Sequence, residues 1–226
     1  MGKLIRNYLL PLLLVLCQLP AAGEARMYTR KARLQDFTVK TTRVVLTGQE
    51  VFDAVLKEEI ASRWMASPYE FCTVHEYMAD KNSNMYYFLR FAFDADYTYM
   101  VLSKSGDPES EDQLKQGFDV VMLPVAPARA TGGDELVFMP AYIDIVQHYV
   151  MRARESEKVA YRGLKGICSR PAGIVYSDRE EALKAFSSEK QDANVRITIP
   201  SAVSDKKRCE FIISTDTHEL RGYKRK

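Results

Sequence analysis

The sequence predicts an α/β or α+β fold in which two main amphipathic helices pack on a layered mixed sheet. Runs rich in β-branched and aromatic residues alternate with stretches of helical spacing along the chain. Two of these stretches, 49–65 and 140–153, place apolar residues along one side of a helix. The hydrophobic and charged fractions, 46% and 27%, are those of an ordinary globular protein. Strands that alternate with helices favour a layered arrangement of the two.

Residues 1–25 have the composition of a signal peptide. Lys3 and Arg6 precede a short apolar run, and small residues follow that run up to Ala25. The run is shorter than the roughly 20 apolar residues that a bilayer-spanning helix needs. We therefore expect cleavage after Ala25, or after Gly23 as the second choice, and a periplasmic or secreted mature chain.

Cys17 is a poor candidate for a lipid anchor because Leu16 precedes it, whereas a lipidated cysteine normally follows a small residue. No other apolar run approaches membrane-spanning length, so we expect no transmembrane helix in the mature chain. We expect residues 26–226 to form a single α/β domain, since a chain of about 200 residues can build one proper core. A net charge of +2 argues against a dedicated nucleic-acid binder.

Residues 26–43 form a basic amino-terminal arm, with six basic side chains against a single acid, Asp36. An arm that contacts phosphate-bearing lipid or polysaccharide would have this composition. A solvated terminus that leads into a first strand would have it as well. We favour the second interpretation because Phe37, Val39 and Thr41 alternate at the strand period.

A strand followed by a helix is predicted between residues 42 and 65. TRVVLT has the composition of a buried strand, and Thr47 and Glu50 match the capping box that starts a helix. The apolar stripe of the helix ends at Trp64, which is therefore expected in the core. Pro68 prevents the helix from continuing, and residues 69–78 would form a second strand.

The remaining elements are predicted from composition and from residues that start or end helices and turns. Pro140 is a good first residue for the second long helix, which we expect to end before Gly163. Ser177 and Glu180 match a second capping box, followed by a short amphipathic helix. Residues 105–117 form a polar, acidic loop. Further strands are predicted at 85–93, 97–103, 118–125, 173–176, 195–203 and 209–215.

Three cysteines remain after removal of the leader: Cys72, Cys168 and Cys209. In an oxidising compartment an odd number allows at most one internal pair. We favour a Cys168–Cys209 disulfide because both residues lie beside strand-like segments. Three buried free thiols remain the alternative.

Cys72 and His75 are the weak candidates for catalysis. A thiol nucleophile needs a neighbouring base, but residues three apart on a strand point to opposite faces of the sheet. The two side chains could meet only if a turn separates them, and the flanking signatures of cysteine hydrolases are missing. A small buried hydrophobe is the favoured interpretation of Cys72.

Metal and cofactor motifs are absent from the sequence. There is no Cys-x-x-Cys pair, and Ala79 stands where a zinc-protease helix beginning at His75 would need its second histidine. Asp144, His148 and Arg152, four residues apart, suit a surface row on a helix. No glycine loop matches a nucleotide-binding fingerprint. We expect neither a metal nor a cofactor.

The order of strand 42–47, helix 49–65, strand 69–78 and two tyrosine-rich runs resembles the amino-terminal α/β domain of TolB and related envelope proteins of the curli-secretion type. The resemblance covers residues 45–105 and is one of architecture. It implies a role in envelope assembly or binding, and it carries no catalytic residue across. The absent lipid-attachment motif departs from the curli-secretion group.

These observations predict a non-enzymatic secreted or periplasmic binding or assembly module of the cell envelope. Its partner would be a protein or another envelope component. Two alternatives remain open. One is an extracytoplasmic hydrolase that uses Cys72 or a dispersed histidine and carboxylate site, and the other is a soluble carrier of a small apolar ligand.

Overall fold

The computed structural model describes residues 27–128 and 133–226. Within these ranges the chain forms two mixed sheets and seven helices, which confirms the predicted α/β class. The predicted leader 1–25, its cleavage site and Cys17 lie outside the described residues. No helix of the described ranges has the length and apolar character needed to cross a membrane.

The first sheet has five strands, and its two halves differ in direction. Strand β1 lies between β2 and β3 and runs parallel to both, whereas β3, β4 and β5 form an antiparallel meander. In spatial order the strands are β2 (Tyr69–Cys72), β1 (Thr41–Val45), β3 (Tyr86–Phe93), β4 (Tyr97–Lys104) and β5 (Phe118–Pro127).

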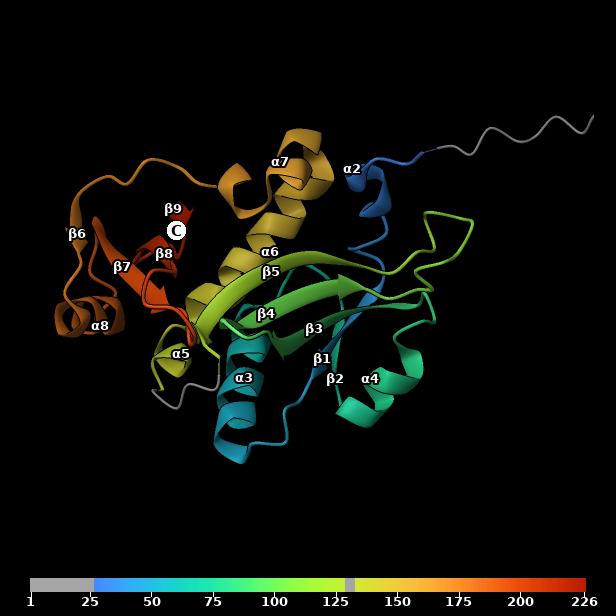
Figure 1. Ribbon diagram of the computed structural model, residues 1–226, viewed down its shortest axis with the longest axis horizontal. Helices are drawn as coiled ribbons and strands as arrows, with labels where there is room; N and C mark the ends of the chain where they lie inside the picture. Colours follow the sequence, from blue (N-terminus) through green and yellow to red (C-terminus); the bar gives the residue numbers. More distant parts are fainter. Residues whose placement is uncertain (1–26, 129–132) are drawn as a thin grey trace, which may run out of the picture.

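Helix α3 (Glu50–Arg63) packs against α6 (Met139–Glu155) on one face of the first sheet. Helix α4 (Val74–Asp80) contacts β1 on the other face. A small cluster of Val45, Cys72 and Phe88 lies under α4. The sheet is therefore covered on both faces, although the cover on the α4 side is small (Figure 1).

The helix starts differ from the predicted ones. Helix α3 begins after Gln49, and the predicted Thr47–Glu50 capping box is wrong. The Asp53 carboxylate instead accepts hydrogen bonds from Thr47 and from the Gly48 amide, each at 2.8 Å. A true capping box does occur, at Thr73 and Glu76, where it starts α4. The predicted strand 69–78 therefore ends at Cys72, and a helix follows it.

The amino-terminal segment is not a solvated arm. A short helix, α2 (Arg30–Arg33), is followed by turns that bring Leu34 and Phe37 into the core, where they are 2% and 0% exposed. The ring of Phe37 makes edge contacts with Trp64 and Tyr87. Trp64 is buried, as predicted. The alternation of Phe37, Val39 and Thr41 does not mark a strand, because turns continue up to residue 40 and β1 begins only at Thr41.

The second sheet has four strands in the order β6 (Ile174–Tyr176), β7 (Ala193–Pro200), β8 (Arg208–Ser214) and β9 (Leu220–Arg225). β6 is parallel to β7, and the other neighbours are antiparallel. Helix α8 (Arg179–Ser187) joins β6 to β7, and its N-cap is Asp178 rather than the predicted Ser177.

The second long helix ends before Gly163, as predicted, but a separate short helix lies between its end and that glycine. Helix α6 stops at Glu155, and Ser156 then caps a separate helix, α7 (Glu157–Arg162). A 3₁₀ turn, η1 (Gly163–Gly166), follows directly. A four-residue helix, α5 (Asp134–Val137), precedes α6.

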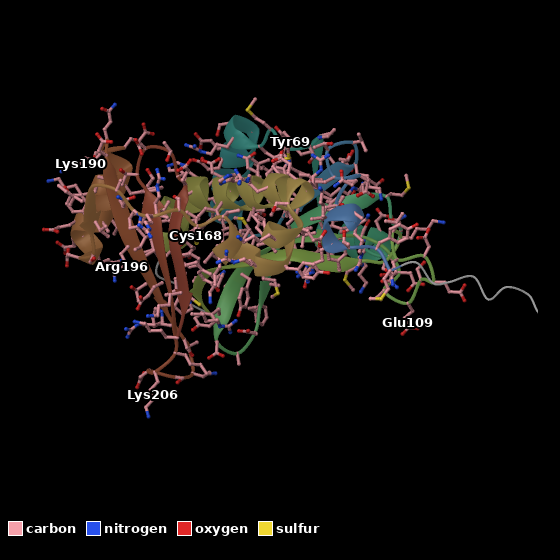
Figure 2. All side chains as sticks on the ribbon, turned by 90° about the horizontal axis from the view of Figure 1, so that it is seen from above. Tyr69, Glu109, Cys168, Lys190, Arg196 and Lys206 are labelled. Atoms are coloured by element: carbon pink, nitrogen blue, oxygen red, sulfur yellow. The ribbon has the colours of Figure 1, made fainter. Side chains whose placement is uncertain are left out.

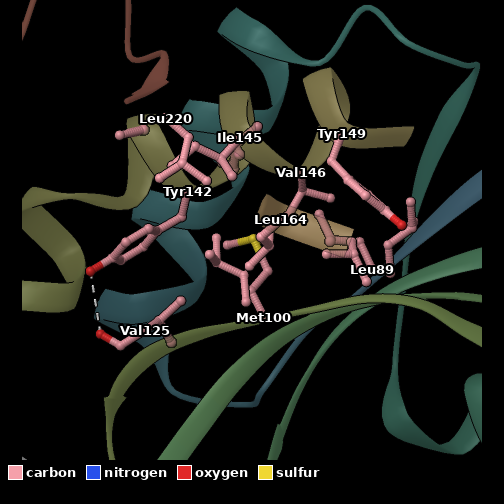
Figure 3. Close-up of a cluster of buried hydrophobic side chains, with 14 of the residues drawn as sticks. Leu89, Met100, Val125, Tyr142, Ile145, Val146, Tyr149, Leu164 and Leu220 are labelled. Atoms are coloured by element: carbon pink, nitrogen blue, oxygen red, sulfur yellow. Dashed lines mark hydrogen bonds between the residues drawn. The ribbon is translucent and has the colours of Figure 1, made fainter. Parts of the chain in front are cut away.

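Helix α6 lies between the two sheets, and its buried side chains belong to the main hydrophobic cluster (Figure 1). Its side chains Tyr142, Ile145 and Val146 contact Met100 of the first sheet and Leu220 of the second within one buried cluster (Figure 3). Residues far apart in the sequence thus share a single continuous core.

Candidate functional site

The structure does not bring Cys72 and His75 together. Cys72 is 3% exposed at the end of β2, in the cluster with Val45 and Phe88. His75 is exposed on the first turn of α4. Burial raises the pKa of the Cys72 thiol to about 11, so the thiol stays protonated near neutral pH. Cys72 is a packed side chain, and no histidine of the described residues forms a hydrogen bond with its thiol.

Cys168 and Cys209 are free thiols in this structure, and the favoured disulfide is not formed. The Cys168 thiol donates to the Leu164 carbonyl at 3.3 Å. The Cys209 thiol lies against the hydroxyls of Tyr97 and Tyr223 in the second sheet. Burial raises the pKa of both thiols. Cys168 also lies against the backbone of Tyr223, the same residue whose hydroxyl lies against Cys209.

His218 occupies a position that the sequence did not reveal. It lies in the turn between β8 and β9, is 7% exposed, and stacks on Phe186 of α8. Its Nδ1 is 2.7 Å from the Asp144 carboxylate, which Arg63 also contacts at 3.2 Å. Asp144 therefore binds residues of other elements, in addition to lying in the predicted row with His148 and Arg152.

No three of the described histidine, cysteine, aspartate and glutamate residues are placed to hold a metal ion together. Asp144, His148 and His218 line a shallow groove, but only the Asp144–His218 contact is a hydrogen bond. Burial, followed by the charge of Arg152, lowers the pKa of His148. The groove therefore contains one hydrogen-bonded pair of a carboxylate and an imidazole, Asp144 and His218, and this pair joins α6 to the turn before β9.

The best-formed concave site is an apolar pocket of about 400 Å³ between the two sheets. Its floor includes Phe138 and Tyr142, both buried. The Tyr142 hydroxyl donates to the Val125 carbonyl at 3.4 Å, so the polar end of the ring is satisfied (Figure 3). The walls come from the end of β5, from α5, from α8 and from residues 196–200 of β7.

Four charged residues contribute to the lining of this pocket: Asp134, Glu135, Arg179 and Arg196. Arg179 of α8 forms two hydrogen bonds, 2.8 and 2.6 Å long, with the Asp134 carboxylate of α5. This pair joins the two helices across one side of the opening. Arg196 lines the pocket from the exposed side of β7 (Figure 2). Among the described residues its guanidinium has neither a hydrogen-bond acceptor nor an ion-pair partner.

One wall of the pocket is an incomplete strand edge. β6 pairs with β7 only at residues 193–195, whereas β7 continues to Pro200 with β8 on its other side. Residues 196–200 therefore have a neighbouring strand on one edge only, within the part of the chain that the structure describes. Every second backbone unit of such a segment presents an N–H and a C=O group to the pocket.

Sequence reasoning missed this pocket because no motif marks it. Its lining comes from five elements spread over residues 125–200, and most of its side chains are ordinary apolar residues. The one available signal was the shortness of the strand before Ser177 compared with the strand after residue 193. That difference leaves part of β7 without a partner.

Comparison of the chain with protein-family models, with curated proteins and with solved structures gave no match.

Proposed function

We propose that this protein is a non-enzymatic binding module of an extracytoplasmic compartment, and that it binds an extended apolar segment of a partner protein in the pocket between the sheets. The observation that carries the proposal is the free edge of β7 at residues 196–200, which forms a wall of an apolar cavity. Addition of a strand to such an edge is a common mode of peptide recognition.

The two parts of the pocket would have separate roles. The backbone groups of β7 would pair with a bound strand and supply affinity that depends little on sequence. Apolar side chains of the partner would enter the cavity over Phe138 and Leu183, where they lose contact with water. The Arg179–Asp134 pair at the rim would limit how far the partner extends.

The resemblance to the amino-terminal domain of TolB and to curli-secretion-type envelope proteins supports an assembly role. The leader-like residues 1–25 support an address outside the cytoplasm. Sequencing the amino terminus of the exported protein tests that address. A first residue at position 26 agrees with it, and an intact Met1 in cytosolic protein contradicts it.

A small apolar molecule is the second candidate ligand. The cavity volume of about 400 Å³ and its largely apolar lining suit such a ligand. A compact molecule would fill the cavity but would leave the β7 backbone groups without partners. The behaviour of those groups on binding therefore separates the two candidates.

The test uses a library of random extended peptides and the chain 26–226. A Leu183→Lys variant places a charge inside the apolar cavity, and Ser187→Lys places the same charge at the exposed end of the same helix. We expect selected apolar peptides to bind the unmodified chain and Ser187→Lys. Binding to Leu183→Lys should weaken at least about tenfold, since a buried charge without a partner costs several kcal/mol.

Hydrogen exchange of the β7 amides completes the test. A bound strand should slow exchange within residues 196–200, because it hydrogen-bonds to their backbone. A fluorescent apolar dye that binds in the cavity without slowing hydrogen exchange of these amides would favour the small-ligand carrier. Peptides that bind Leu183→Lys as well as the unmodified chain would exclude the pocket as their site.

A further inference from the structure

A second cavity, of about 540 Å³, lies on another part of the surface and has a different character. Its walls come from α2, from the edge of β5, from the α7–η1 region and from β9. Three cationic side chains line it: Arg30, Arg162 and Lys165. All three are exposed. This site shares no lining residue with the apolar pocket between the sheets.

The positive charge of this cavity is not neutralised by the protein. Among the described residues, none of the three cations has a carboxylate within ion-pair distance. The one acid in the lining, Asp119, is bound by Arg90 at 3.2 Å. Glu157, the acid at the start of α7, forms no ion pair with described residues, and its single negative charge is smaller than the charge of the three cations. The cavity therefore carries an excess of positive charge.

Neighbouring cations strengthen this field. Arg33 donates to the Gln116 carbonyl at 3.4 Å, and Arg154 donates to the Leu34 carbonyl at 3.2 Å. Both bind neutral oxygen atoms, so they keep their full charge. Burial, and next the charge of Arg30, lowers the pKa of Arg33. Arg30 and Arg33 thus lie close enough to repel each other.

The fold holds the three cations in one place. Arg30 donates to the Ala160 carbonyl at 3.4 Å, which fixes its guanidinium beside α7. Arg162 is the last residue of α7 and caps η1, and Lys165 lies three residues later within η1. Side chains three residues apart in a 3₁₀ turn lie on the same side. Gly166 allows this turn to pack closely, since a Cβ there would be 2.9 Å from the Val159 Cα.

We propose that the cavity lined by Arg30, Arg162 and Lys165 is a binding site for a phosphate ester. Guanidinium groups form paired hydrogen bonds with phosphate oxygens, and three cations can balance the one or two negative charges of a phosphate ester. Tyr161, 67% exposed at the rim, offers a ring face for the organic part of the ligand. A dissolved phosphate ester and a phospholipid headgroup share this chemistry.

The test measures binding of glycerol phosphate by calorimetry and of vesicles by co-sedimentation, with the chain 26–226. One variant combines Arg30→Gln, Arg162→Gln and Lys165→Gln. Its control combines Lys57→Gln, Lys184→Gln and Lys224→Gln, which removes the same number of exposed charges elsewhere. Vesicles contain either phosphatidylglycerol or phosphatidylcholine alone.

We expect saturable binding of glycerol phosphate, of phosphatidylglycerol vesicles, or of both, and no binding of phosphatidylcholine vesicles. The cavity variant should bind at least about tenfold more weakly, because it loses three cationic hydrogen-bond donors, and hydrogen bonds to charged groups are the stronger ones. The control should bind like the unmodified chain. Binding of glycerol phosphate alone identifies a dissolved ligand, and binding of phosphatidylglycerol vesicles alone identifies a headgroup.

Two results would overturn the proposal. One is the absence of saturable binding to either phosphate probe. The other is an equal loss of binding in the control, which would show a response to total charge instead of a site. If the triple variant unfolds, Lys165→Gln replaces it, because this exposed side chain has no hydrogen bond or ion pair within the described chain. It should still weaken binding several-fold.

Discussion

The imidazole Nδ1 of His218 lies 2.7 Å from the carboxylate of Asp144, and this contact joins the turn between β8 and β9 to helix α6. Arg63 of α3 contacts the same carboxylate oxygen at 3.2 Å. On its other side the histidine ring stacks on Phe186 of α8. Three helices and the second sheet therefore meet around one carboxylate.

Replacement of that carboxylate should destabilise the fold. Asp144→Ala leaves buried His218 without its carboxylate partner and Arg63 with Glu59 alone, so we expect the free energy of unfolding to fall by about 2 kcal/mol. Glu58→Ala removes an exposed carboxylate from α3 and should change the free energy of unfolding by less than about 0.5 kcal/mol. Urea unfolding measures both. Equal losses in the two variants would show that Asp144 has no special role.

The partly buried ion pairs of Asp36 with Lys104 and Lys40 should make the stability of the fold depend on pH in the acid range. Burial alone would raise the pKa of Asp36, but hydrogen bonds from Lys104, Tyr87 and Lys40 outweigh it and hold the pKa below its ordinary value. The unfolded chain therefore takes up a proton at this site before the folded chain does. The stabilisation is full above about pH 4 and is lost as pH falls through the lower, folded pKa.

Asp36→Asn isolates this contribution from that of the other acids. The difference in the free energy of unfolding between Asp36→Asn and the unmodified chain should be largest near pH 6 and should shrink towards pH 3. Urea unfolding at several pH values measures it. A difference that stays constant over this range would contradict the lowered pKa.

The thiols should react slowly in the folded protein and completely in the unfolded one. Cys72 and Cys209 are buried, and the pKa of Cys72 is raised to about 11, so little thiolate forms at pH 8. The chain 26–226 should give three reactive thiols in denaturant without a reductant. A single thiol before reduction would support the Cys168–Cys209 disulfide instead.

Gly106 lies where the two ends of the acidic loop 105–117 meet, and a residue with a side chain does not fit there without a shift of the backbone. Its φ is +145°, and an added Cβ would stand 2.0 Å from the Lys115 carbonyl oxygen. Gly106→Ala should lower the free energy of unfolding by more than about 2 kcal/mol, because backbone must move. Gly48→Ala is the control, since Gly48 also has a positive φ but has open space around it. Thermal unfolding that shifts equally in both variants would contradict the steric argument.

Much of the fold was predictable because local patterns and burial agree. The runs that became β3, β4, β5 and β8 alternate or cluster apolar residues as buried strands do, and Pro140 lies in the first turn of α6. The stripe that ends at Trp64 is likewise core. In each case the side chains that suit the element also face the interior.

The rest depended on tertiary contacts. The capping residues of α3 were misread because Asp53 reaches back to Thr47 in place of Glu50. Strand β9 was missed because LRGYKR looks polar, although Leu220 and its pairing with β8 hold it in place. Both cavities join residues from distant parts of the chain, so the spacing of residues carries no trace of them.

The last hairpin completes a core that begins at the opposite end of the described chain. Phe211, Ile213 and Leu220 belong to the same buried cluster as Phe37. A polypeptide that is exported from its amino terminus, as proposed, would lack this part of the core until nearly all of its length has crossed the membrane. The core would then be completed only on the far side.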